Sequence, residues 1–180
     1  MTDLSPYASE LRRAMHTLAE DERVVFLGQA VRVAGTAMRT TLEDIDPERL
    51  IELPVEEDLQ LGMSVGMAIA GMVPVSVFPR WNFVVLAANQ LVNHLDKLGE
   101  MIQSIPPKVI IRTSIGSVNP LDPGPQHQGD LTEGFRLLCP HIEFVRLDSA
   151  DVVVPAYERA LRREDGVSTV LVEWGDKYAA

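Results

Sequence analysis

Two segments of the sequence hold side chains that could do acid–base chemistry. Glu56, Glu57 and Asp58 open a helical pattern, where the helix dipole and unpaired amide groups favour carboxylates, so helix capping is the simplest interpretation. A glutamate here could also act as a general acid near neutral pH if apolar surroundings raised its pKa. His127 lies in Pro125–Asp130, a polar loop with a glycine and no apolar periodicity. It is the second candidate for a site residue.

The remaining histidines and the cysteine carry weaker signals. His16 and His94 fall within helical patterns and His141 follows Pro140, which favours structural or solvated roles. Cys139 follows two leucines and has no evident base nearby, so we predict a buried, unreactive thiol. The sequence contains no Gly-x-Gly-x-x-Gly, no Gly-x-x-x-x-Gly-Lys-Ser/Thr, no Gly-x-Ser-x-Gly and no His-Glu-x-x-His. A familiar phosphate-binding loop is therefore missing.

Apolar runs alternate with helical patterns along the chain, which is typical of α/β structure with a mostly parallel sheet. The predicted strands are Val24–Leu27, Leu50–Leu53, Val73–Phe78, Lys108–Thr113, Ile142–Leu147 and Thr169–Glu173. The predicted helices are Ser5–Leu18, Glu57–Met72, Asn82–Ile102, Leu131–Leu138 and Ala150–Arg162, the last with an N-cap in Asp148–Asp151. Several of the strands are apolar throughout, as strands covered on both faces must be. We predict a three-layer sandwich around a mostly parallel six-stranded sheet.

Two long segments, Gly28–Glu48 and Ser114–Asp130, do not follow this alternation. Long loops in small domains tend to carry function. The second loop follows an apolar strand, so it should lie at the carboxyl edge of the sheet, where parallel sheets bind ligands. Arg112 and this loop could shape a pocket for an acidic or polyhydroxylated substrate, but structural or surface roles explain them equally well. No repeat or linker divides the chain, and we predict a single domain over residues 1–180.

Composition restricts the class of protein further. The 180 residues, 46% apolar and 23% charged, are typical of one globular domain. A net charge of −10 without a basic run argues against a nucleic-acid partner. No apolar run is long enough to cross a membrane, and the N-terminus resembles neither a signal nor a transit peptide. With one cysteine and no disulfide framework, we expect a cytoplasmic protein.

The helix predicted after Leu53-Pro54 is rich in small residues. Gly62 and Gly66 are followed by three more of them, Ala68, Ala70 and Gly71. Glycine in a helix costs about 1 kcal/mol relative to alanine, so a compensating contact is expected. Close approach to the domain's own sheet and close approach to a partner helix explain the spacing equally well.

Several strings of the sequence, read together with the order of the elements, resemble a known family. They are Asp21-Glu-Arg-Val-Val-Phe-Leu-Gly28, Leu53-Pro-Val-Glu-Glu57 running into Gly62-Met-Ser-Val-Gly66, Asn89-Gln-Leu-Val-Asn-His94, Pro125–Asp130 and Leu138-Cys-Pro140. From Tyr7 to Tyr178 the chain resembles the pyrimidine-binding domain of thiamine-diphosphate enzymes, as in the beta subunit of 2-oxo acid dehydrogenases and the central domain of transketolase. The resemblance implies that fold and thiamine diphosphate as cofactor.

The resemblance also implies roles for particular residues. Glu57 would hydrogen-bond the aminopyrimidine ring nitrogen and stabilise the imino tautomer that deprotonates the thiazolium carbon. His127 would face the substrate, where it would assist proton transfer or stabilise charge on the substrate oxygen. Phe83 would lie beside the pyrimidine ring. The helix with Gly62 and Gly66 would pack across the subunit interface that holds the cofactor.

Two positions depart from the family pattern. Arg80 stands where the family usually has the phenylalanine that stacks on the pyrimidine, so either Arg80 stacks through its planar guanidinium or Phe78 replaces it after a local shift. Gln29 stands where the dehydrogenase beta subunits commonly have a glutamate, which removes a negative charge near the cofactor. The chain also ends without the carboxy-terminal domain of the transketolases and those beta subunits. We therefore expect chemistry other than that of a lipoamide-reducing dehydrogenase.

The family binds diphosphate and magnesium through a second domain with a Gly-Asp-Gly motif, whereas Gly129-Asp130-Leu131 lacks the third glycine. We therefore expect an obligate diphosphate-binding partner subunit, with magnesium held mainly by that partner, in a heterotetramer with cofactors at its interfaces. The predicted activity is transketolase-like transfer or carboligation of an acyl carbanion equivalent formed from a 2-oxo acid or ketose. One alternative is the beta subunit of a 2-oxo acid decarboxylase or dehydrogenase. Another is a non-catalytic scaffold subunit.

Overall fold

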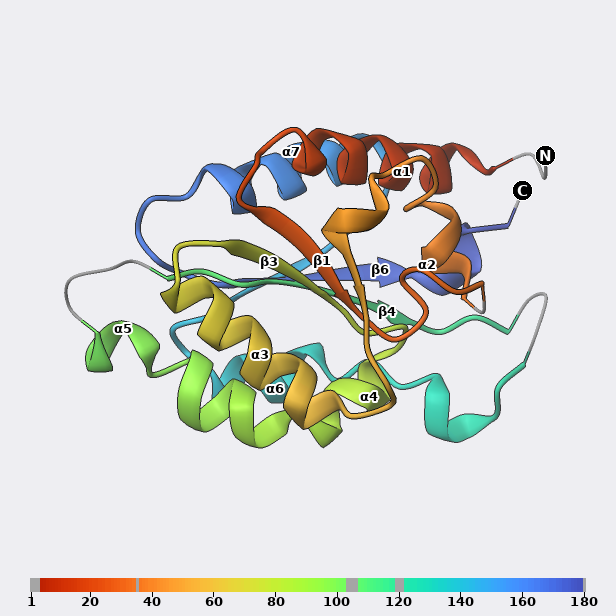
Figure 1. Cartoon of the computed structure of the whole chain (residues 1–180). Coiled ribbons are helices and arrows are strands. Elements are labelled where there is room, and N and C mark those ends of the chain that lie inside the picture. The colour runs from red at the N-terminus through yellow and green to blue at the C-terminus, as the bar shows by residue number, and fades with distance from the viewer. Residues whose placement is uncertain (1–3, 35, 103–106, 119–121, 180) are drawn as a thin grey trace.

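In the computed structural model, a sheet of six parallel strands lies between two layers of helices (Figure 1). The structure describes residues 4–34, 36–102, 107–118 and 122–179. The strand order is β2-β1-β3-β4-β6-β5, and every neighbouring pair is parallel. The strands are β1 (Val24–Gly28), β2 (Leu50–Glu52), β3 (Val73–Val77), β4 (Ile110–Ile115), β5 (Glu143–Arg146) and β6 (Thr169–Trp174). The predicted three-layer α/β fold is confirmed.

Each face of the sheet has its own helical layer (Figure 1). One layer contains α1 (Pro6–Ala19), α2 (Ala37–Thr40) and α7 (Ala150–Arg162). The other contains α3 (Glu57–Ile69), α4 (Trp81–Leu86), the π-helical segment η2 (Gln90–Leu95), α5 (Leu98–Met101) and α6 (Thr132–Leu138). Three short 3-10 turns complete the described elements: η1 (Pro47–Arg49), η3 (Pro125–His127) and η4 (Gly175–Lys177). No helix in the described ranges has the length and apolar character that crossing a membrane requires.

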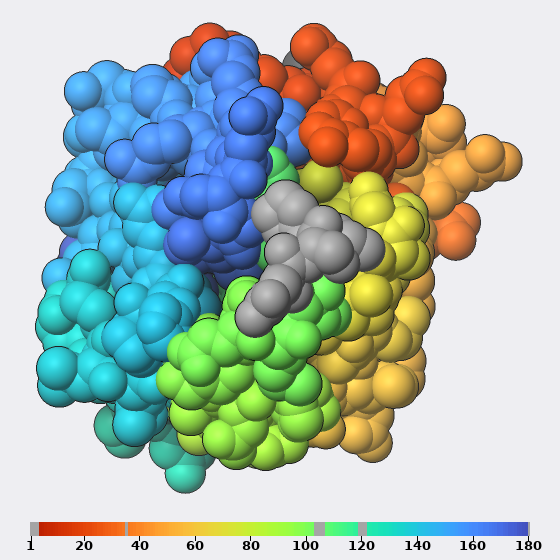
Figure 2. Space-filling model, turned by 90° about the vertical axis from the view of Figure 1, so that its left-hand side faces the viewer, coloured from red at the N-terminus to blue at the C-terminus, as the bar shows by residue number. Residues whose placement is uncertain are grey.

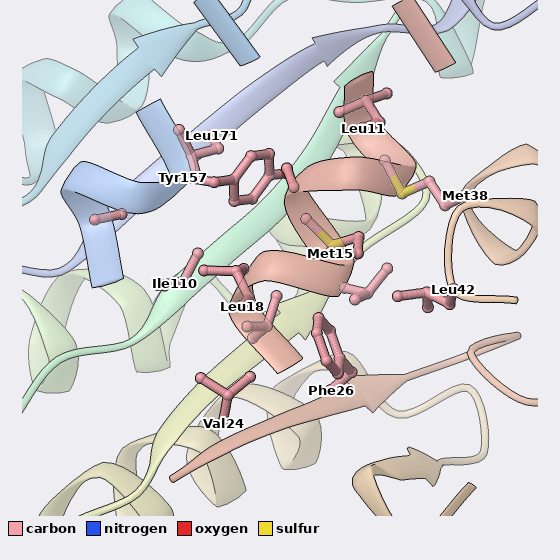
Figure 3. Packing of buried hydrophobic residues seen from close by; sticks show 14 of the residues in the cluster. Leu11, Met15, Leu18, Val24, Phe26, Met38, Leu42, Ile110, Tyr157 and Leu171 are labelled. Carbon is pink, nitrogen blue, oxygen red and sulfur yellow. The ribbon is translucent and has the colours of Figure 1, made fainter. Parts of the chain in front are cut away.

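The core under α1 and α7 follows from the helical spacing of apolar residues. Leu11, Met15 and Leu18 are fully buried on one face of α1 and pack toward Val24 and Phe26 of β1 (Figure 3). Burying one such side chain is favourable by about 1.5–3 kcal/mol. This layer therefore holds the sheet edge formed by β1 and β2 in place.

The core on the opposite face is built around Trp81, the first residue of α4. Its ring stacks on Phe135 of α6, with ring centroids 5.3 Å apart and planes 11° apart. Cys139 is fully buried in the same cluster, and burial is the main cause that raises the pKa of its thiol to about 12. The prediction of a buried cysteine is confirmed, and a neutral thiol is a poor nucleophile.

All six predicted strands are present, with ends that differ by at most two residues. The predicted long helix Asn82–Ile102 is wrong, because this stretch is divided into α4, η2 and α5. The amide of Asp96 bonds the carbonyl of Leu91, five residues back, which is the wider turn of a π-helix. The widened turn lets the buried Asp96 carboxylate accept a hydrogen bond from the backbone of His141 at 2.8 Å.

Smaller differences concern the helix ends and the loops. The helix predicted over Glu57–Met72 ends at Ile69, and the loop predicted over Gly28–Glu48 contains α2 and part of η1. Ser149 occupies the N-cap position of α7, but its side chain makes no capping hydrogen bond. Figure 2 shows the end of the molecule away from the carboxyl ends of the strands, where the green region that includes α5 borders cyan chain from the last third of the sequence on one side and the yellow α3 and β3 region on the other.

Candidate functional site

Polar side chains gather at the carboxyl ends of β1, β3 and β4, which are neighbours in the sheet. The larger of two adjoining cavities there, about 320 Å³, is lined by Gln29, Arg80, Phe83 and His127 among others. The smaller one is lined by Glu57 together with Gln29 and Phe83. Because the two cavities share lining residues, they form one cleft. All five site residues predicted from the sequence line this cleft: Gln29, Glu57, Arg80, Phe83 and His127.

Glu57 is the first residue of α3 and lies at the smaller cavity. Glu57 is only 8% exposed, and no described residue forms a hydrogen bond or ion pair with its carboxylate. Its neighbour Glu56 also lines this cavity but is exposed, and Asp58 instead accepts a hydrogen bond from Gln90 at 3.3 Å. No side chain caps α3 by a hydrogen bond. Burial without a protein partner singles out Glu57 among the three carboxylates.

Gln60, which the sequence analysis missed, fixes the first turn of α3 over the sheet. Its buried side-chain amide donates to the Ser76 hydroxyl and to the Val77 carbonyl of β3, both at 3.0 Å. Gln60 follows Glu57 by three residues, so the two side chains share a helix face. The signal in the sequence was a polar residue at a position where the helical pattern expects an apolar one.

His127 lies in η3 at the larger cavity, and its ring is held by the ring of Phe83. The two ring centroids are 5.7 Å apart. The Nδ1 atom of His127 is buried and has no hydrogen-bond partner among the described residues. The imidazole therefore lines the cavity with one ring nitrogen, Nδ1, that is covered by protein and unsatisfied.

Arg80 precedes α4 and turns toward the His127 loop. Its Nη1 donates to the Gly116 carbonyl and, at 3.3 Å, to the His127 carbonyl. Burial lowers the pKa of Arg80, and the charge of Asp176 opposes this effect. Phe78, the other predicted stacking residue, is only 1% exposed and packs in the core under α4, although it also borders the smaller cavity.

Gln29 is placed by the loop that follows β1. The carboxylate of Glu52, at the end of β2, accepts hydrogen bonds from the amides of Ala30 at 2.6 Å and Arg32 at 2.7 Å. Burial raises the pKa of the Glu52 carboxyl, but the hydrogen bonds from the backbone amides together outweigh burial. The pKa of Glu52 is therefore lowered. Gly28 has φ +152°, and a Cβ there would lie 2.4 Å from the Val77 carbonyl oxygen. The loop thus depends on glycine at this position.

Arg112 has a structural role and does not line the cleft. It is fully buried, and its Nε lies 2.6 Å from Oε1 of Glu173. Tyr157 donates to the same oxygen at 2.6 Å, and Tyr178 donates to the other carboxylate oxygen. Burial lowers the pKa of Arg112, but Glu173 and the neighbouring tyrosines together outweigh burial. The pKa of Arg112 therefore lies well above its ordinary value. The ring of Tyr178 lines the larger cavity, so this ion pair supports the cavity wall.

The two interior glycines of α3 do not contact the domain's own sheet. A Cβ at Gly66 would meet no atom within 4 Å, and one at Gly62 would meet only the side chain of Gln90, at 3.5 Å. Leu59 of the same helix is 51% exposed. The small-residue spacing had two interpretations, close approach to the domain's own sheet and close approach to a partner helix. The first is ruled out for these two glycines. Among the described residues, no group of three His, Cys, Asp or Glu side chains could hold a metal ion.

The sequence model of the family "Transketolase, pyrimidine binding domain" matches residues 7–177. This chain belongs to that family. The resemblance inferred from the sequence strings is confirmed.

Curated relatives include beta subunits of 2-oxo acid dehydrogenases. The 3-methyl-2-oxobutanoate dehydrogenase subunit beta of Mycobacterium tuberculosis is 28% identical over 155 residues, covering 81% of this chain and 40% of its own length. The pyruvate dehydrogenase beta subunit of Rickettsia bellii is 34% identical over 91 residues, covering 48% of this chain and 28% of its own. The chain thus spans less than half the length of these relatives.

Among solved structures, a split-gene transketolase described as an inactive beta4 tetramer superposes with a TM-score of 0.73. The sequences are 14% identical, and the match covers 97% of this chain and 52% of the transketolase chain. At this identity the likeness concerns the fold alone.

Proposed function

We propose that this chain provides the pyrimidine-binding half of a thiamine-diphosphate site, with Glu57 as the residue that hydrogen-bonds the aminopyrimidine ring. The observation that carries the proposal is Glu57, a residue only 8% exposed that lines the cleft and whose carboxylate has no hydrogen-bond partner among the described residues. A protonated ring nitrogen bound in the cleft would donate a hydrogen bond to this carboxylate.

The other cleft residues fit the same ring. Phe83 lines both cavities and offers an aromatic face, and Gln29 offers an amide that can donate or accept without adding charge. Phe78 borders the smaller cavity from the core and remains a candidate for the stacking contact. These residues match an aminopyrimidine in chemistry, with an aromatic face and a neutral amide beside the carboxylate.

Glu57, Phe83 and Gln29 would hold the aminopyrimidine ring of thiamine diphosphate, which when bound would supply a nucleophilic carbon and an electron sink for acyl-group chemistry. Glu57 accepts the hydrogen bond that favours the imino tautomer, and Gln60 keeps the first turn of α3 in register over the sheet. His127, at the larger cavity, moves a proton to or from the substrate oxygen through Nδ1 or its other ring nitrogen. Phe83 holds the imidazole ring in place for that step.

The proposal includes a partner subunit that binds diphosphate and magnesium, in a heterotetramer joined through α3. Gly66 supports it, because a Cβ there would meet no atom of this chain within 4 Å, which leaves room for the backbone of a partner helix. The split-gene transketolase described as inactive when it consists of beta chains alone is consistent with this need. The single domain over residues 1–180 and the cytoplasmic location expected from the sequence remain predictions.

For the second half of the reaction we propose transketolase-like transfer of the acyl group to a sugar or aldehyde acceptor. The neutral Gln29 in the cleft supports this choice. The sequence relatives favour a second candidate, the beta subunit of a 2-oxo acid decarboxylase or dehydrogenase. Carbon dioxide released from a 2-oxo acid in the absence of any acceptor would favour the second candidate, and product formed only with an acceptor would favour the first.

The proposal is tested by Glu57→Gln in the complex with the diphosphate-binding partner, with Glu164→Gln as the matched control. Glutamine keeps the size of the side chain and removes its charge, so we expect activity to fall by about 10²–10⁴-fold, the usual range for a group that moves protons in catalysis. Glu164 is exposed after α7 and lines neither cavity, so its variant should keep wild-type activity. Wild-type activity of Glu57→Gln would reject the proposal and favour a non-catalytic scaffold.

A further inference from the structure

Arg80 joins the two ends of the loop that carries His127. Its Nη1 donates to the carbonyl of Gly116, directly after β4, and to the carbonyl of His127 in η3. Eleven positions separate these two acceptors in the sequence, yet one nitrogen reaches both. Hydrogen bonds from a charged donor are stronger than those between neutral groups.

The beginning of the same loop has a second anchor on the side of the carboxy-terminal turn η4. Asp176 accepts a hydrogen bond from the amide of Val118 at 2.7 Å. Within the described ranges no carboxylate lies in ion-pair contact with Arg80, so its bonds to the two carbonyls are its principal polar contacts. The guanidinium therefore acts on this loop rather than on a neighbouring acid.

His127 is held from both sides by one turn of α4. The amide of Phe83 bonds the carbonyl of Arg80 at 3.1 Å, so the two residues are fixed relative to each other. Phe83 contacts the imidazole ring, while Arg80 holds the backbone of the same histidine. A displaced Arg80 would leave the ring contact without its backbone support.

We infer that Arg80 is a positioning residue that fixes the loop around His127, and that it does not take the place of the aromatic residue that stacks on the pyrimidine. The inference deepens the proposed function and rests on it for the part that His127 plays in the reaction. Its structural half, the holding of the loop, stands independently of any cofactor. The two halves are tested by different measurements.

The structural half is tested on the chain alone by hydrogen exchange of the amides at 116–118 and 122–128. Arg80→Met keeps the length of the side chain and removes the donors, so we expect about tenfold faster exchange there, as the loss of charged hydrogen bonds implies. Arg80→Lys keeps one charged donor and should recover part of the protection. Arg162→Met, on the exposed face of α7, is the matched control and should leave these amides unchanged. Unchanged exchange in Arg80→Met would overturn the inference.

The catalytic half is tested in the complex with the diphosphate-binding partner. Loss of Arg80 should lower kcat about tenfold or more, with partial rescue in Arg80→Lys, while the dissociation constant of thiamine diphosphate changes less than about threefold. A stacking role predicts the opposite pattern: weaker cofactor binding in Arg80→Met and recovery in Arg80→Phe, which would overturn the inference. If the wild-type complex binds no thiamine diphosphate, the proposed function fails, and the exchange measurement still decides whether Arg80 holds the loop.

Discussion

The three tyrosines of the chain converge on one buried carboxylate, that of Glu173. Tyr157 and Tyr178 donate hydrogen bonds to it, and its charge also acts on Tyr7. Burial first, and the charge of Glu173 second, raise the pKa of each hydroxyl above the ordinary value of 10.0. This cluster supports Tyr178 at the wall of the cleft, so its ionisation state bears on the shape of the site.

The raised pKa values predict alkaline unfolding. Below pH 10 the tyrosines are protonated in both the folded and the unfolded chain, so they cause no dependence on pH. Above pH 10 the unfolded chain releases these protons and the folded chain keeps them, so stability falls by up to about 1.4 kcal/mol per tyrosine and pH unit. Tyrosinate absorbance should therefore rise in a single step that coincides with unfolding followed by circular dichroism. A gradual rise near pH 10 in the folded protein would contradict the buried cluster.

At the scale of the elements, the turn after β1 depends on a glycine. Gly28 has φ +152°, and an added Cβ would lie 2.4 Å from a backbone oxygen of β3, which cannot move without disturbing the sheet. Gly28→Ala should therefore lower the free energy of unfolding by about 2–3 kcal/mol or more. Gly134→Ala in α6 meets no atom within 4 Å and should instead add about 0.5–1 kcal/mol. Urea titration of both variants measures the difference, and equal stabilities would contradict the predicted clash.

The outward glycines of α3 predict separate effects on folding and on assembly. Gly66→Leu places a large side chain where the chain itself has no atom within 4 Å, so the isolated chain should fold with unchanged or slightly higher stability. Association with the partner subunit should weaken by at least about tenfold, because the helices could no longer approach closely. Gly134→Leu on α6 is the matched control. Unaltered assembly of Gly66→Leu, measured by sedimentation, would place the interface elsewhere.

Periodicity was enough to predict the strands but not the shape of the helical stretch after β3. Leu91, Leu95 and Leu98 are all buried and continue the helical spacing, so the π-helical segment η2 leaves no mark on the apolar pattern. The wide turn is accompanied by a long-range bond between Asp96 and the backbone of His141, which no local pattern can indicate. The candidate site residues followed mainly from the family resemblance, and they lie around one cleft because the carboxyl ends of parallel strands converge on one edge of the sheet. Gln60 was missed since its partners lie on β3, distant in sequence.

At the scale of the whole molecule, the cleft contains side chains that could contact an aromatic ring and a substrate, but few of the residues that line it are charged. Glu57 and Arg80 are separated along the cleft, with Phe83 and Gln29 lining both cavities between them. The uncovered Gly66 lies on the helix that begins with Glu57, so a partner helix there would adjoin the pyrimidine end of the cleft. The proposed site is therefore shared between two chains, and cofactor binding should depend on both.

This dependence is measured most directly by calorimetric titration of thiamine diphosphate with magnesium into the chain alone and then into its complex with the diphosphate-binding partner. We predict binding to the complex and none to the isolated chain, with about one cofactor per chain pair. Glu57→Gln in the complex serves as the control and should weaken that binding. Tight binding to the isolated chain would contradict a shared site, and absence of binding to the complex would contradict the thiamine-diphosphate function itself.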